Sequence, residues 1–208
     1  MWDADDLWEA LRNSVFIGVL ASLASMLLGS LSAFALHRYQ SRLQKIHLGA
    51  LTVPLVLPDI LTGISLLLFF VMIRMETGFL TIWIAHVTFC LSYVTMVVLA
   101  RLQDFDFTLI DAARDLGASR WQVVREITLP LLAPGIIAGG LLAFTLSIDD
   151  FVITFFVQGP GATTLPIRVY SMMKVSQNLP VVNALSTLLL GLTFIVVAFS
   201  FRLTRSKL

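Results

Sequence analysis

The sequence has little charge and a single cysteine. Charged residues make up 13% of its 208 positions, about half the share found in soluble domains. Cys90 has no second thiol to pair with, so a disulfide within the chain is excluded and we expect Cys90 to fill apolar space. The net charge of +1 provides no field that would attract nucleic acid. The acidic N-terminus also lacks the basic start of a secretory signal.

Patterns of catalysis and metal binding are missing as well. No glycine-rich loop ends in a lysine that could hold nucleotide phosphates, so we expect any ATP hydrolysis to occur in another subunit. The three histidines, His37, His47 and His86, have no companions at metal-ligand spacing, and we interpret them as structural. The sequence therefore predicts no enzyme, no metal site and no cofactor bound directly by this chain.

What the chain does have is long apolar runs, with 58% apolar residues overall. Each run is near the ~20 residues that cross a bilayer, which predicts an all-α membrane protein. We expect about five transmembrane helices, at residues 14–36, 48–73, 79–100, 134–157 and 181–201. Residues 1–13 are predicted to be an amphipathic lead-in on the outer face, and residues 14–208 a single membrane domain.

Two of these spans carry further local signals. The first has small residues at spacings of three and four, which predicts one face for close helix contact: Gly18, Ala21, Ser25, Gly29 and Ala33. The second contains Pro54 and Pro58, which predict a kinked or broken helix with Asp59 in the break.

Basic residues are unevenly shared between the loops. Ten of the 14 Lys and Arg residues fall in alternate loops and the C-terminal tail. By the positive-inside rule these segments are cytoplasmic, which includes residues 101–133 and the C-terminus. The N-terminus is then predicted to lie outside.

The longest polar interruption, residues 111–130, has the pattern of two short helices joined at a glycine. Thr108 is predicted to cap the first helix with Asp111, and Ser119 to cap the second with Gln122. Gly117 suits a left-handed turn between them. Trp121, Val124, Ile127 and Thr128 share a helical face that we expect to be buried, and Pro130 and Pro134 are expected to end this helix and start the next span. On pattern alone, an ordinary cytoplasmic loop is an equal alternative to a docking element.

The same residues resemble a known motif. Asp111-Ala112-Ala113, Gly117 and Ile127-x-Leu129-Pro130 are similar to the EAA loop of ABC importer permeases, with Asp in place of the usual Glu. The resemblance implies a type I ABC importer transmembrane domain whose loop docks into an ATPase subunit. It implies these coupling residues: Asp111, Ala112, Ala113, Asp115, Gly117, Ala118 and Arg120.

Further segments narrow the resemblance. Pro58-Asp59-Ile60, Ser147-Ile148-Asp149-Asp150 and Leu165-Pro166-Ile167-x-x-Tyr170-Ser171-Met172 resemble the second permease subunit of spermidine/putrescine importers. That likeness implies a bacterial inner-membrane protein surrounded by lipid. Its implied partners are a homodimer of ATP-binding subunits that hold ATP and Mg, a second homologous permease and an extracytoplasmic solute-binding protein. Such permeases usually have six spans, so we expect that the first of the six is missing here.

Carboxylates at membrane depth point to a cationic solute. Asp59, Asp149 and Asp150 lie in predicted spans, where each charge costs ~2.5–3.5 kcal/mol and usually faces a cavity or a cation. Phe151 and Tyr170 could add cation–π contacts to a polyamine ammonium. Neighbouring helix residues point about 100° apart, so at most one of Asp149 and Asp150 should face the pathway fully.

Alternatives remain at this stage. Asp59 could cap the half-helix after Pro58, and Asp149 or Asp150 could pair with an Arg or Lys of the outer loop. The solute could be ferric iron, thiamine or a phosphonate, and a membrane scaffold or integral enzyme without transport is a further class.

Overall fold

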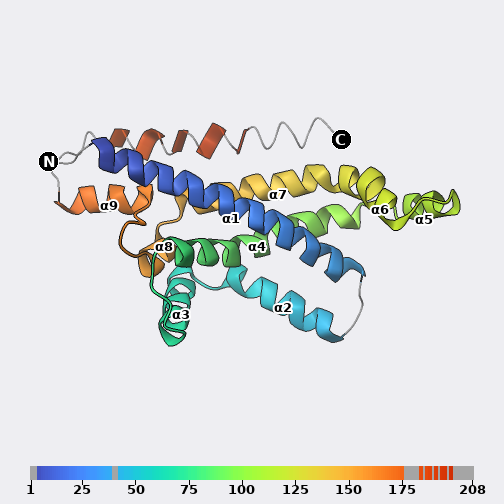
Figure 1. Cartoon of the computed structure of the whole chain (residues 1–208), viewed down its shortest axis with the longest axis horizontal. Coiled ribbons are helices and arrows are strands. Elements are labelled where there is room, and N and C mark those ends of the chain that lie inside the picture. Colours follow the sequence, from blue (N-terminus) through green and yellow to red (C-terminus); the bar gives the residue numbers. More distant parts are fainter. Residues whose placement is uncertain are drawn as a thin grey trace.

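Three long helices form the body of the molecule. The computed structural model describes residues 4–38, 42–175 and parts of 183–198, and every regular element in them is helical. Helices α1 (Ala4–Arg38), α4 (Phe79–Gln103) and α7 (Leu129–Asp149) pack against one another along their lengths (Figure 1). All three are long and apolar enough to cross a membrane. Parts of the predicted fifth span, residues 181–201, lie outside the described residues, and the described parts are helical.

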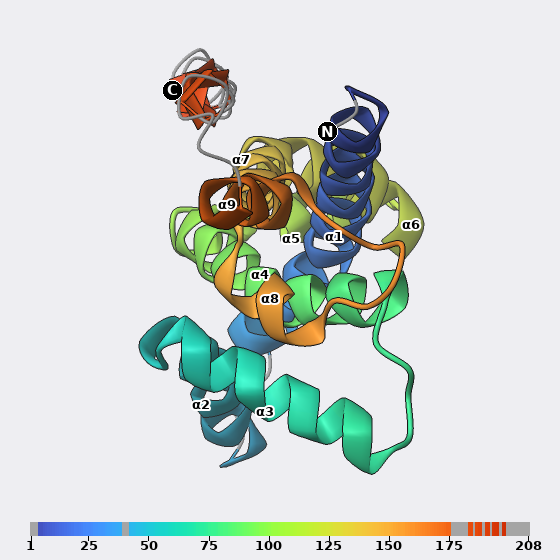
Figure 2. The same ribbon diagram turned by 90° about the vertical axis from the view of Figure 1, so that its left-hand side faces the viewer.

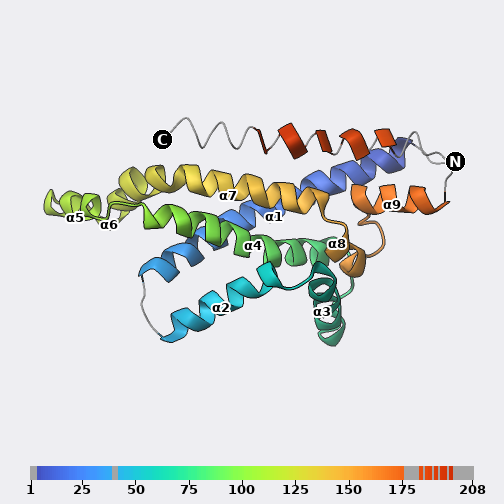
Figure 3. The same cartoon turned by 180° about the vertical axis from the view of Figure 1, so that it is seen from behind.

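A bent pair of helices fills the place of the predicted second span. α2 (Arg42–Val56) and α3 (Asp59–Met72) lie on either side of Leu57 and Pro58, and the chain direction bends by 115° between them. The predicted break is therefore confirmed, and α3 stands across the direction of the bundle (Figure 3). Its Gly63 lies against Phe156 of α8 (Val152–Val157), which lets the two helices approach closely.

The predicted fourth span, residues 134–157, is not one helix. A continuous helical segment runs from Arg120 to Asp149. The helix is interrupted at Asp150 and Phe151, and α8 follows. The expectation that Pro130 and Pro134 end the preceding helix is wrong. A π-helical segment, η1 (Val123–Thr128), leads directly into α7, and the helical segment continues through Pro130 and Pro134.

The predicted small-residue face of α1 is confirmed. Ala21, Ser25 and Ala33 have no exposed surface. A Cβ on Gly29 would lie 2.9 Å from Val94 of α4, and one on Gly18 would lie 3.1 Å from Phe144 of α7. The small size of the side chains on this strip, and their absence at Gly18 and Gly29, is therefore what lets α4 and α7 lie directly on α1.

The first residues of α1 form part of the same helix rather than a separate lead-in. Asn13 Nδ2 donates to the carbonyl of Thr163 at 3.1 Å, and Ser14 Oγ accepts from the Leu165 N–H at 2.8 Å. Leu7 and Leu11 pack against α9 (Leu165–Val175). The start of α1 is thus bound to α9 at one end of the molecule (Figure 2). The short helices α5 (Thr108–Asp115) and α6 (Arg120–Gln122) lie at the other end.

Gly159 offers a test of this end of the structure. A Cβ at Gly159 would lie 1.9 Å from the carbonyl oxygen of Thr77, so the backbone itself must move. We expect Gly159→Ala to lower the melting temperature of the purified protein by several degrees, the shift that about 1–3 kcal/mol produces. Gly49→Ala is the matched control, because nothing lies within 4 Å of its Cβ. Equal melting temperatures for the two variants would contradict the close approach at Thr77.

Candidate functional site

Of the three local features predicted for α5, α6 and the turn between them, two are present. Gly117 adopts φ +84°, the left-handed conformation that favours glycine. Ser119 N–H donates to Gln122 Oε1 at 2.8 Å, and Gln122 N–H donates to Ser119 Oγ at 3.3 Å, so this capping box is confirmed. The predicted box of Thr108 with Asp111 is wrong.

Asp106 caps α5 in its place. The Asp106 carboxylate accepts from the hydroxyl of Thr108 at 2.7 Å and from its N–H at 3.0 Å. Thr108 therefore donates its hydroxyl to Asp106 instead of receiving the helix N–H groups. The same two bonds, the hydroxyl bond first, hold the pKa of Asp106 below its usual range.

The burial of the second short helix differs from prediction. Thr128 is buried as predicted, but Trp121 is 70% exposed, Val124 is also exposed, and Val123 is buried instead. The cause is η1, in which the Thr128 hydroxyl bonds back to the carbonyl of Val123, five residues earlier. A π-helical turn has more residues than an α-helical one, so Val123 shares the buried face with Thr128, while Trp121 and Val124 turn away from the core.

The predicted coupling residues lie together on the surface of this tip. Two of them are half-buried, Ala113 and Ala118, and the others are exposed: Asp111, Ala112, Asp115, Gly117 and Arg120. The prediction missed the apolar part of the same tip, where Leu116 is 90% exposed and Trp121 is 70% exposed. A large apolar side chain left in water on a polar loop is typical of a contact surface for another protein.

The tip is also connected to the end of α1. The His37 ring stacks on Phe107 with a centroid distance of 4.8 Å and an interplanar angle of 7°. Beside this stack lies a cavity of about 700 Å³ whose lining includes Arg38, Arg114 and Arg120. The residue that precedes α5 is therefore in direct contact with the last turn of α1.

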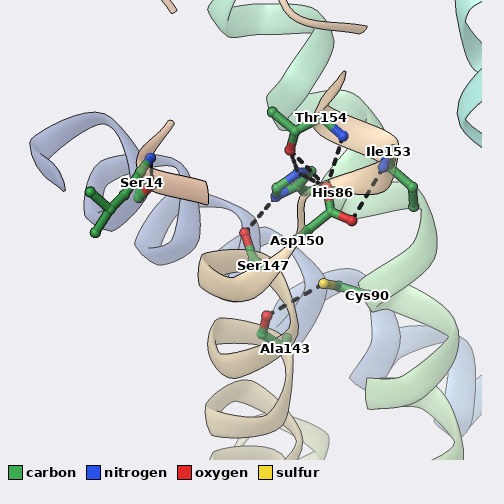
Figure 4. A network of polar contacts seen from close by, with 9 residues as sticks. Ser14, His86, Cys90, Ala143, Ser147, Asp150, Ile153 and Thr154 are labelled. Carbon is green, nitrogen blue, oxygen red and sulfur yellow. Dashed lines mark hydrogen bonds and ion pairs between the residues drawn. The ribbon is translucent and has the colours of Figure 1, made fainter. Parts of the chain in front are cut away.

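A second polar site lies inside the bundle, at the break between α7 and α8. His86 of α4 is 1% exposed, and its Nδ1 lies 2.6 Å from Ser147 Oγ (Figure 4). Its Nε2 lies 2.9 Å from Thr154 Oγ1 and 3.3 Å from Asp150 Oδ2. The sequence had indicated an isolated histidine. A titratable residue in a membrane span usually pairs with another polar group. This general rule was the signal in the sequence that His86 has polar partners.

The two adjacent carboxylates have different surroundings. Asp150 accepts from the N–H groups of Ile153 and Thr154 and from the Thr154 hydroxyl, so it caps α8. Asp149 is exposed at the end of α7. Within the described residues neither carboxylate pairs with an Arg or Lys, so that alternative is wrong for this part of the chain.

Phe151 and Tyr170 are brought together although they are far apart in sequence. Their ring centroids lie 4.8 Å apart, and Phe155 lies 6.2 Å from the same tyrosine. Lys174 Nζ sits 5.0 Å above the Tyr170 ring, which shows that this ring already accepts an ammonium group in cation–π geometry.

Asp59 lies apart from these residues, in the first turn of α3. It is exposed, and the N-terminus of α3 has no side-chain cap, so the capping alternative is wrong. Because α3 packs against α8, Asp59 belongs to the neighbouring helix rather than to the polar cluster itself.

Comparison with known proteins agrees with this architecture. Residues 14–206 match the family described as binding-protein-dependent transport system inner membrane component. The match covers most of the chain, and the protein belongs to this family. It is therefore a membrane permease component of a transport system.

The names of similar curated proteins give a transported solute, which the family description does not. The chain is 42% identical over 203 residues to the spermidine/putrescine transport system permease protein PotC of Escherichia coli, covering 98% of this chain and 76% of that protein. It is 46% identical over 199 residues to the putrescine transport system permease protein PotI of the same species, covering 92% and 70%. Identity to PotC of Haemophilus influenzae is 40% over 207 residues, covering 100% and 80%.

Solved structures share the fold. A chain of the inward-facing MetNI methionine ABC transporter aligns with a TM-score of 0.76 at 16% identity, covering 99% of both chains. A chain of a bacterial alginate ABC transporter aligns with a TM-score of 0.73 at 16% identity, covering 95% of this chain and 78% of that one. The predicted fold, an ABC importer transmembrane domain, is confirmed.

Proposed function

We propose that this chain is a permease subunit of an ATP-driven importer of polyamines. The observation that carries the proposal is the 40–46% identity to spermidine and putrescine permeases across nearly the whole chain. The site agrees in chemistry, because an exposed carboxylate at Asp149 and the aromatic pair Phe151 and Tyr170 suit a chain of ammonium groups.

We assign a different partner to each end of the molecule. The tip formed by α5 and α6 faces the cytoplasm and docks into a dimer of ATP-binding subunits, which hold ATP and Mg. A second homologous permease completes the pathway, with Asp59, Asp149 and the Phe151–Tyr170 pair lining this chain's half. A solute-binding protein delivers the amine at the end where α9 meets the start of α1.

ATP binding and solute movement are then linked through the tip. Closure of the ATPase dimer displaces α5, and η1 carries the displacement into α7 without a hinge loop. α7 ends at Asp149, so the cytoplasmic displacement reaches the residue that we place in the pathway. Binding at either end therefore changes the free energy of binding at the other.

Asp149 provides the test of the cargo. In cells that express the whole transporter, we expect Asp149→Asn to lower polyamine uptake about tenfold, because a hydrogen bond to a charged group is worth about 1.5–3 kcal/mol. Radiolabelled spermidine and putrescine are the substrates. Glu76→Gln is the control, since Glu76 is an exposed carboxylate in the turn before α4. Normal uptake by Asp149→Asn would remove this residue from the pathway.

The cargo itself is tested by the copurifying solute-binding protein. Calorimetric titration with spermidine, putrescine, ferric iron, thiamine and a phosphonate distinguishes a polyamine importer from importers of other solutes. Binding of a solute other than an amine would overturn the proposed cargo while leaving the family unchanged.

A further inference from the structure

His86 joins three separate pieces of the chain at the break in the bundle. Its two ring nitrogens reach Ser147 in the last turn of α7, and Asp150 and Thr154 around the start of α8. Figure 4 shows the ring between these groups, with Cys90 one turn away on α4 and bonded only to the Ala143 carbonyl. The position of α8 relative to α7 thus depends on one side chain of a third helix.

The proton positions in this cluster follow from counting donors. A threonine hydroxyl has one hydrogen, and Thr154 donates it to the Asp150 carboxyl group, with 2.7 Å between Oγ1 and Oδ2. Thr154 Oγ1 must then accept from His86, so the ring carries a hydrogen on Nε2. Each member of the cluster has a partner in the assigned network. Removing one leaves a buried polar group unsatisfied, which favours a different arrangement of the break.

The residues on either side of Asp150 are the ones that would meet the cargo. Asp149 precedes it, exposed at the end of α7, and Phe151 follows it, in contact with Tyr170. Asp150 itself is committed to the α8 cap. Fixing the Asp150 carboxylate therefore fixes where the carboxylate of Asp149 and the ring of Phe151 lie relative to each other.

We propose that His86 is a positioning residue that sets the importer's preference among amines of different length. It acts through Asp150 and Thr154, which hold Asp149 and Phe151 at a fixed separation. This inference rests on the proposed polyamine cargo. A diamine and a triamine can both place one ammonium group on the carboxylate and one on the aromatic pair. The diamine has a single spacing between its ammonium groups, whereas the triamine offers three, so the diamine loses more when that separation changes.

The experiment compares uptake of spermidine and putrescine by the assembled transporter. We expect His86→Gln and Thr154→Val to raise the spermidine-to-putrescine rate ratio about tenfold, roughly the effect of losing one hydrogen bond to a charged group. Thr154→Ser restores the hydroxyl and should keep the ratio within about twofold of wild type. Cys90→Ala, a buried change on the same helix outside the cluster, should leave the ratio unchanged.

Equal loss of both amines in His86→Gln and Thr154→Val, with an unchanged ratio, would overturn the inference and leave only a structural role. Membrane abundance measured by immunoblot separates low expression from low rate. A wild-type transporter that imports neither amine would instead overturn the proposed function.

A second measurement does not depend on the cargo. Cys90, the chain's one cysteine, is buried, so Asp149→Cys introduces the single accessible thiol. We expect its reaction rate with a cationic methanethiosulfonate reagent to change about tenfold when His86→Gln is added, because the end of α7 moves. An unchanged rate would contradict the positioning role whatever the solute.

Discussion

A transporter with Gly117→Val should hydrolyse ATP but import less than about a tenth of the wild-type amount of solute. Gly117 has φ +84°, and a β-branched residue there costs about 2 kcal/mol. The Cβ itself meets nothing within 4 Å, so the effect is conformational and not a clash. The turn relaxes, α5 no longer presents the docking conformation, and its population falls about 30-fold. Uptake and ATPase rates in proteoliposomes measure the loss of coupling.

Two variants separate this effect from general damage. Gly117→Asn should retain most coupled uptake, because asparagine tolerates the left-handed conformation. Gly161→Val introduces the same conformational conflict, at φ +74°, in the loop before α9. It should leave the ratio of imported solute to hydrolysed ATP unchanged even where it lowers the uptake rate. Full coupling in Gly117→Val would show that α5 does not transmit the displacement.

Trp121→Ala should remove the ATPase subunits from the purified complex. An exposed tryptophan at the centre of an interface typically contributes 2 kcal/mol or more, so the affinity should fall at least about 30-fold. Adding Leu116→Ala should complete the loss, since Leu116 lies on the same exposed tip. Copurification in detergent, with the ATPase detected by immunoblot, is the measurement.

Trp8 gives a matched control for this experiment. It is 69% exposed, against 70% for Trp121, and lies near the start of α1 at the opposite end of the molecule. Trp8→Ala should leave copurification of the ATPase intact. If Trp8→Ala released the ATPase and Trp121→Ala did not, the proposed orientation in the membrane would be reversed.

Local patterns in the sequence predicted the features that depend on neighbouring residues. The left-handed turn at Gly117 and the Ser119–Gln122 box involve residues within three positions of each other, and both are present. The break after α2 follows from Pro58, and the close packing of α1 follows from its small residues. These are consequences of backbone sterics, which act over one or two turns.

Features that depend on distant contacts or on an unusual helix could not be read from local patterns. His86 lies 61 positions from Ser147 and 68 from Thr154, so no spacing rule connects them. Trp121 was assigned to a buried face because an α-helical period was assumed, and η1 departs from that period. Of the predicted pathway residues, Phe151 and Tyr170 meet only because α9 folds back beside α8.

The length of helix α1 has a mechanical consequence. Its 35 residues make a rod of about 50 Å, at 1.5 Å per residue. One end contacts the tip that we propose faces the ATPase, through His37 and Phe107, and the other is bonded to the start of α9 and the loop before it, through Asn13 and Ser14. A helix resists compression along its axis, so we expect it to act as a strut. If ATP binding tilted α1 at the end near the tip, the loop before α9 at its other end would move as well. The nucleotide state of the ATPase would then change the surface that the solute-binding protein contacts on the other side of the membrane.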